Sequence, residues 1–151
     1  MQTPKSFVMN KAKVQGRIMI TVAGLVLLSV IFMIITIPFV LQDTSPGAGP
    51  IGAVIGIGVL ILLQLTVLLG FLKTIRKIKQ GRPAGKGLNI VSGILLILFG
   101  LFYVDGAFAF LGIILFVPTL MFISASCDIM AALMTFIALF LKPKKSNEIE
   151  L

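Results

Sequence analysis

The sequence predicts an all-α integral membrane protein, a bundle of four transmembrane helices with both termini in the cytoplasm. The first observation is composition: 58% of the 151 residues are hydrophobic and only 12% are charged, too few to cover a soluble domain. The second is that Lys and Arg are absent from two long windows, 18–72 and 87–141. Such runs are typical of membrane spans. We therefore expect a single transmembrane domain over 18–141.

The thirteen basic residues gather in three short segments. These are Lys5, Lys11, Lys13 and Arg17; Lys73, Arg76, Lys77, Lys79, Arg82 and Lys86; and Lys142, Lys144 and Lys145. Cytoplasmic segments of membrane proteins carry such an excess of Lys and Arg, so we place all three in the cytoplasm of a multi-pass plasma-membrane protein. The net charge of +8 then reflects topology and not nucleic acid binding. The middle segment could also contact anionic lipid headgroups.

The first half of the chain predicts a basic cytoplasmic arm at 1–17 and a first span at 18–41. The span is too long for the apolar core of a cleaved signal peptide, and at ~1.5 Å per residue it can cross the bilayer with some tilt. Residues 42–50 contain Pro and Gly and form an outer turn. The second span follows at 51–72.

Two features mark the second span. Gly52 and Gly56 have the spacing that allows close approach of two helix backbones. We expect them to pack within the monomer, with an oligomer contact as the alternative. Gln64 is the one strongly polar side chain of this span. After the span, 73–79 should continue the helix, and the glycines and proline that follow should end it.

The third span is expected at 87–104, with Gly93 and Gly100 on a small helix face that suits close packing. The stretch Tyr103–Gly106 has the composition of a turn, which would place Asp105 outside the membrane. A long apolar stretch then follows before the last basic segment.

Three arrangements accommodate that stretch. In the favoured one, 107–117 is re-entrant or the outer part of a long bent last helix, and 119–141 is the fourth span. In the second, the fourth span is 107–127 and an apolar cytoplasmic helix follows. In the third, both segments cross and the last basic segment lies outside, against the positive-inside pattern. Residues 142–151 form a cytoplasmic tail.

The last span has a small and polar face centred on Asp128. Steps of three and four residues along a helix place the following on one stripe: Met121, Ser124, Ala125, Asp128, Ala131, Ala132 and Thr135. This face should turn into the bundle. A carboxyl group at mid-bilayer costs about 3 kcal/mol on insertion scales, so it must be paired, hydrated or protonated.

No Lys or Arg lies in the spans to pair with Asp128, so its expected neighbours are polar. Counting helical rise places Asp128 level with Ser29 and Gly100, and Gln64 about one turn nearer the cytoplasm. Ser124 and Thr135 complete this predicted ion or polar site. The alternative interpretation is an uncharged Asp128 that only joins two helices.

Other chemistry finds no support in the sequence. There is one cysteine and no histidine, which excludes an intramolecular disulfide and disfavours zinc and haem sites. A lone carboxylate lacks the partner that acid–base catalysis needs. We therefore expect no enzyme activity, no metal and no cofactor.

The leading functional hypothesis is an accessory or structural subunit that joins a homo-oligomer or a larger membrane complex. The alternative is a proton- or cation-handling channel or transporter subunit that uses Asp128. A shift of 69 residues aligns Gly24 with Gly93 and Thr66 with Thr135. This alignment raises the idea of two parallel helical hairpins.

Overall fold

The computed structural model describes residues 4–42, 50–80, 82, 86–110 and 116–140. Within these ranges it contains four α-helices and no strand: α1 (Pro4–Leu41), α2 (Pro50–Lys79), α3 (Lys86–Phe110) and α4 (Phe116–Phe140). Each helix holds an apolar segment long enough to cross a membrane. The predicted all-α bundle of four apolar helices is confirmed, and the chain is a multi-pass integral membrane protein.

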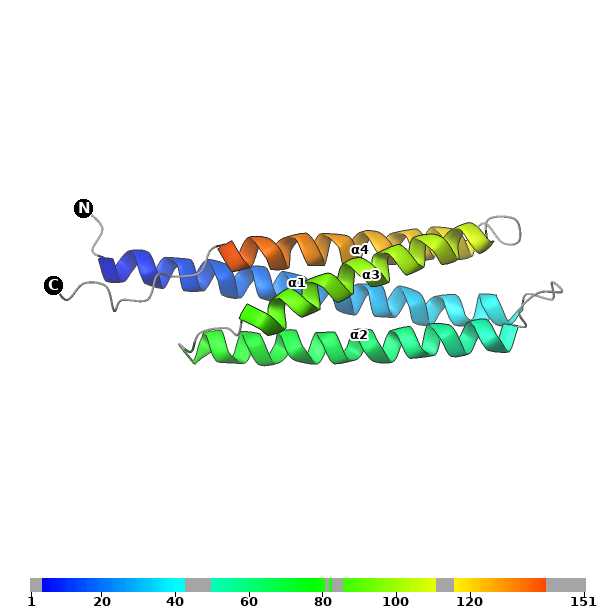
Figure 1. Cartoon of the computed structure of the whole chain (residues 1–151), viewed down its shortest axis with the longest axis horizontal. Coiled ribbons are helices and arrows are strands. Elements are labelled where there is room, and N and C mark those ends of the chain that lie inside the picture. Colours follow the sequence, from blue (N-terminus) through cyan, green and yellow to red (C-terminus); the bar gives the residue numbers. More distant parts are fainter. Residues whose placement is uncertain (1–3, 43–49, 81, 83–85, 111–115, 141–151) are drawn as a thin grey trace.

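The helices run up and down along one long axis (Figure 1). The start of α1, the end of α2, the start of α3 and the end of α4 therefore lie toward the same side of the bundle. We call this side the basic end. The described basic residues of this end are Lys5, Lys11, Lys13, Arg17, Lys73, Arg76, Lys77, Lys79, Arg82 and Lys86. The other side is called the opposite end.

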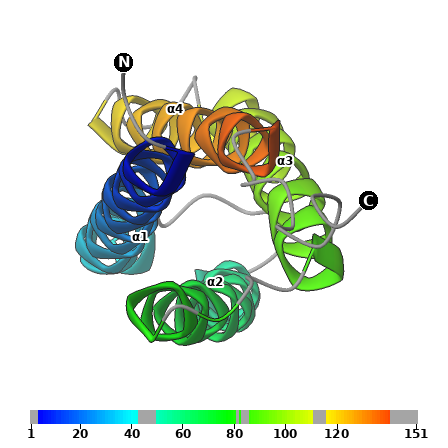
Figure 2. The same cartoon turned by 90° about the vertical axis from the view of Figure 1, so that its left-hand side faces the viewer.

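The order around the bundle is α2, α1, α4, α3, as the end view in Figure 2 shows. Helix α4 packs closely along both α1 and α3, whereas α2 packs along α1 and meets α3 only sparsely. Small side chains on the buried face of α4, such as Ala125, Ala131 and Ala132, allow two neighbours to approach one helix. This central position places the buried face of α4 between the other helices.

Helix α1 begins at Pro4, so the described part of the predicted basic arm is helical and continuous with the first span. Proline fits the first turn of a helix because its missing N–H has no partner there in any case. Gln15 is buried and its Nε2 donates to Ala138 O at 3.2 Å. The basic half of α1 is thus attached to the end of α4.

Helix α2 continues to Lys79, as predicted for residues 73–79. Three basic side chains in its last turn, Arg76, Lys77 and Lys79, complement the negative end of the helix dipole. The Arg82 N–H then donates to Lys77 O at 3.0 Å and helps to satisfy the carbonyl groups left free at the helix end.

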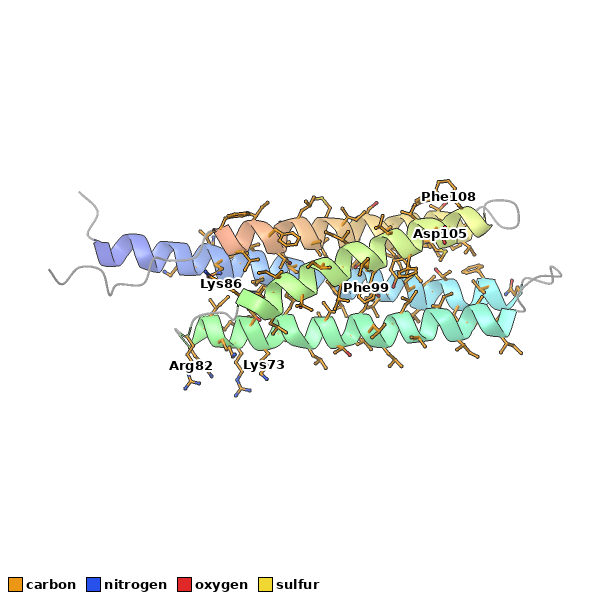
Figure 3. The ribbon with its side chains drawn as sticks, viewed as in Figure 1. Lys73, Arg82, Lys86, Phe99, Asp105 and Phe108 are labelled. Atoms are coloured by element: carbon orange, nitrogen blue, oxygen red, sulfur yellow. The ribbon has the colours of Figure 1, made fainter. Side chains whose placement is uncertain are left out.

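The predicted turn at Tyr103–Gly106 is wrong, because α3 runs through it to Phe110. Gly106 faces α4, where an added Cβ would lie only 2.7 Å from Met121 Cε. The glycine therefore permits close helix packing and does not mark a turn. Asp105 remains exposed on the outer surface of the helix, and Figure 3 shows it near the opposite end.

The last apolar stretch forms one helix, α4, from Phe116 to Phe140. This excludes the arrangement with a fourth span at 107–127, and Asp128 lies inside a helix and caps none. Pro118 belongs to the first turn of α4, where it breaks no helical hydrogen bond. Of the segment 107–117, the beginning is the last turn of α3 and the end is the first turn of α4.

Some predicted features lie outside the described residues. These are the start of the basic arm at 1–3, most of the turn at 42–50, the helix-ending residues 81 and 83–85, the middle of 107–117 at 111–115, and residue 141 with the tail at 142–151, which contains Lys142, Lys144 and Lys145.

Candidate functional site

Asp128 lies in the middle of α4 with no solvent-exposed surface (0%). The other six residues of the predicted stripe are buried with it, and the bulky residues between them are exposed or half-buried. The predicted orientation of this helix is therefore confirmed. The helix is oriented in this way because small residues allow tight packing inside the bundle, whereas bulky apolar residues are suited to contact with lipid.

Ser29 and Ser124 join α1 to α4 next to Asp128. The Ser29 hydroxyl donates to Ser124 O at 3.4 Å, and the Ser124 hydroxyl donates to Ser29 O at 3.3 Å. Both residues are fully buried. This reciprocal pair of bonds holds Ser29 of α1 at the depth of Ser124, one turn from Asp128 in α4. The helical rise counted from the sequence predicted the same depth for Ser29.

Gln64 brings α2 to the same level. Its Nε2 donates to Asp128 Oδ2 at 2.6 Å and to Ser29 Oγ at 3.1 Å. An amide nitrogen carries two hydrogens, so both are used. Gln64 was expected a turn nearer the basic end, but its side chain contacts Asp128 directly. Asp128, Gln64, Ser29 and Ser124 thus form one buried cluster, which we call the polar cluster.

Two oxygen atoms of the polar cluster have no hydrogen-bond partner among the described residues. They are Asp128 Oδ1 and Gln64 Oε1. A buried polar atom without a partner costs free energy comparable to a lost hydrogen bond, and more in hydrocarbon. No Lys or Arg occurs in either membrane window to supply a charge. The cluster therefore has unused capacity to bind a positive group.

Tyr103 of α3 is a neighbour of the polar cluster that the sequence did not predict. Its side chain is completely buried, and its hydroxyl has no partner among the described residues. Gly100, one turn before it, lies against Ala125 and Ile129, which flank Asp128. The expected turn at Tyr103–Gly106 had placed it at the end of the third span, away from Asp128. The available signal was that it is the only tyrosine of the chain and shares a helix face with Leu96, Phe99 and Gly100.

Thr135, which was predicted in the site, is buried but does not bond to the polar cluster. Its hydroxyl donates to Ala131 O of its own helix at 2.7 Å. This bond is local and satisfies the hydroxyl. The structure therefore places Thr135 on the same face as Asp128, nearer the basic end, without linking the two.

The four glycines singled out for packing fall into two pairs. An added Cβ at Gly93 would lie 3.1 Å from Phe136 Cζ, and one at Gly100 would lie 2.9 Å from Ile129 Cγ1 and 3.3 Å from Ala125 O. These two glycines lie directly against α4. Gly52 and Gly56 are exposed, with no atom within 4 Å of an added Cβ, so within the described chain they contact no other helix.

The basic segment around the end of α2 is open to the surroundings. Lys73, Arg76, Lys79, Arg82 and Lys86 are exposed, and Lys77 is half-buried. Figure 3 shows Lys73 and Arg82 pointing away from the bundle. Behind them, the Thr74 hydroxyl lies 3.3 Å from Asn89 Oδ1, where it joins α2 to α3. Such positions are suited to contact with headgroups.

Side chains of the kinds that usually hold metal ions do not gather among the described residues. These residues contain no group of three or more His, Cys, Asp or Glu side chains placed to hold a metal ion. Cys127 is a half-buried free thiol. No protein-family model, curated protein or solved structure matches this chain, so the inference of function depends on the polar cluster itself.

Proposed function

We propose that this chain is a non-enzymatic membrane protein that passes a proton or a small cation through the bilayer at Asp128. The observation that supports this most strongly is a buried carboxyl group with one unpartnered oxygen, whose other oxygen accepts from Gln64, which also donates to Ser29. Ionisable residues inside a membrane are costly and mark ion pathways. Asp128 lies inside the membrane although the spans contain no basic residue to pair with it.

Buried polar residues also occur on both sides of this level. Toward the basic end lie Ser92, Asn89 and Thr74, and toward the opposite end lies Thr36. A permeating ion needs such groups to replace part of its hydration. In this proposal the basic end and both termini face the cytoplasm of a plasma membrane. The two hairpins, α1 with α2 and α3 with α4, are then parallel in orientation.

The test is ion flux into liposomes that contain the purified protein. We expect Asp128→Asn to reduce proton and alkali-cation flux to the level of empty liposomes, because the variant removes the negative charge that attracts the ion. It should still fold, since the new amide can accept from Gln64 Nε2 and supply a donor to Gln64 Oε1.

The matched control is Asp105→Asn, which removes an exposed carboxylate of α3 outside the polar cluster and should leave the flux unchanged. Circular dichroism and gel filtration would establish that both variants are folded. Equal flux through wild type and Asp128→Asn would reject the proposal.

A second candidate function is assembly, as an accessory or structural subunit of a homo-oligomer or larger complex. It is supported by Gly52 and Gly56, which present an open, exposed helix face on α2 at the spacing typical of close helix contacts. If copies meet there, Gly56→Val should shift the protein from oligomer to monomer. Crosslinking in native membranes would measure this, and an unchanged oligomer distribution would argue against the contact.

A further inference from the structure

Three unpartnered oxygen atoms from three different helices suggest what the polar cluster binds. They are Gln64 Oε1 of α2, Tyr103 Oη of α3 and Asp128 Oδ1 of α4. All three side chains are fully buried. Each atom can accept, and carboxylate and amide oxygens are acceptors only unless a proton is added. Two acceptor-only oxygens, together with a phenol oxygen that can accept as well as donate, are suited to surround a positive ligand.

Two of these atoms are held at the same level. Gln64 Nε2 lies 2.6 Å from Asp128 Oδ2, and Oε1 and Oδ1 are the second atoms of the same two planar groups. Gln64 is fixed further by its bond to Ser29 Oγ at 3.1 Å. The two free oxygens are thus presented by side chains whose other polar atoms are already engaged, which is the preorganisation that a binding site needs.

Tyr103 approaches the same level from the opposite end. Gly100, one turn before it, lies against Ala125 and Ile129, which flank Asp128. Side chains on a helix lean toward its N-terminus, and the N-terminus of α3 is at the basic end. The phenol of Tyr103 therefore leans back toward the level of Asp128.

The ligand class follows from the donor set and the charge. Oxygen ligands without unpartnered nitrogen or sulfur select hard cations. Only one carboxylate is present, and the described residues hold no acidic cluster. A monovalent ion would be neutralised by Asp128, whereas a divalent ion would leave a buried net charge at high cost. The hydroxyls of Ser29 and Ser124 retain lone pairs that can complete the coordination.

We propose that Asp128, Gln64 and Tyr103 form a binding site for one partly dehydrated alkali-metal cation. This inference rests on the proposed function and names the ion that it carries. Tyr103 is assigned as a ligand from α3, and with the hydroxyl of Ser29 from α1 the site draws on all four helices. The probe chosen for the test is sodium.

The experiment measures binding of sodium to the full chain in detergent, in a buffer whose only other cation is a large organic one. Radioactive sodium in a scintillation proximity assay gives the affinity. We expect saturable binding to wild type, none to Asp128→Asn, and affinity about tenfold weaker for Tyr103→Phe, which corresponds to the loss of one neutral ligand. Thr66→Val is the control, since the Thr66 hydroxyl is exposed, lies outside the polar cluster and bonds to Leu62 O of its own helix.

Each other outcome overturns a defined part of the inference. Wild-type affinity in Tyr103→Phe removes Tyr103 from the site. Displacement of sodium by equimolar calcium or magnesium rejects the monovalent class. Absence of sodium binding, together with proton flux that depends on Asp128, rejects the cation site but leaves the proposed function intact. Absence of both rejects the two together.

Discussion

Replacement of Gln64 by Met should destabilise the bundle by about 1–3 kcal/mol. Gln64 is the donor that the described structure provides to Asp128 Oδ2, at 2.6 Å, and it also bonds to Ser29. Methionine has a similar length but no donor, so it would leave the buried carboxyl group with neither oxygen satisfied. The cost is large because the carboxyl group is fully buried, where an unsatisfied polar atom is expensive. Equilibrium unfolding by SDS in mixed micelles, followed by circular dichroism, measures it.

The same substitution in an Asp128→Asn background is the control. An amide costs less than an ionisable carboxyl group to leave without a partner, so Gln64→Met should lose less stability there than in wild type. The difference between the two losses is the coupling energy of the pair. Equal losses in the two backgrounds would mean that the bond between Gln64 and Asp128 contributes nothing to stability.

The membrane class and the orientation of α4 could be predicted from the sequence because both depend on periodic, one-dimensional signals. The two windows without Lys or Arg mark the parts of the chain that cross the membrane. The periodic spacing of small residues around Asp128 predicts which face of α4 is buried. These signals hold because lipid penalises any other arrangement: backbone groups must form a helix, and a carboxyl group must turn inward.

The neighbours of Asp128 were only partly predictable. Counting of helical rise gives a depth for each residue, and it placed Ser29 and Gly100 correctly. It does not give the reach of a long side chain, which is why Gln64 was placed a turn away from a residue that it contacts. Nor does it give the order of helices around the bundle, which decides whether Gly56 or Gly100 meets another helix.

Tyr103 was missed for a different reason. Asp105 followed by Gly106 has the composition of a turn, and in water such a pair commonly forms one. Here Gly106 lies against the Met121 side chain of α4, and Asp105 is exposed within a turn and a half of the end of α3. Tertiary packing therefore overrides the local preference, and the helix continues past the one tyrosine that approaches the polar cluster.

Replacement of Gly100 by Val should separate α3 from α4 and cost about 1–3 kcal/mol of stability. A Cβ at this position would lie 2.9 Å from Ile129 Cγ1 and 3.3 Å from Ala125 O. The Ile129 side chain can rotate, but the carbonyl belongs to the helix backbone and moves only if the two helices move apart. Separation would also withdraw Tyr103 from Asp128. The variant should therefore lose stability in SDS titration and lose sodium affinity together.

Gly56→Val is the matched control, because it makes the same change in an apolar helix where no atom lies within 4 Å of the new Cβ. Its monomer should unfold at the same SDS fraction as wild type, even if its oligomer is weakened. Packing against α4, and not the helix propensity of glycine, then explains the difference between the variants. Equal destabilisation by the two substitutions would contradict this explanation. Loss of stability in Gly100→Val with unchanged sodium affinity would separate the helix contact from the binding site.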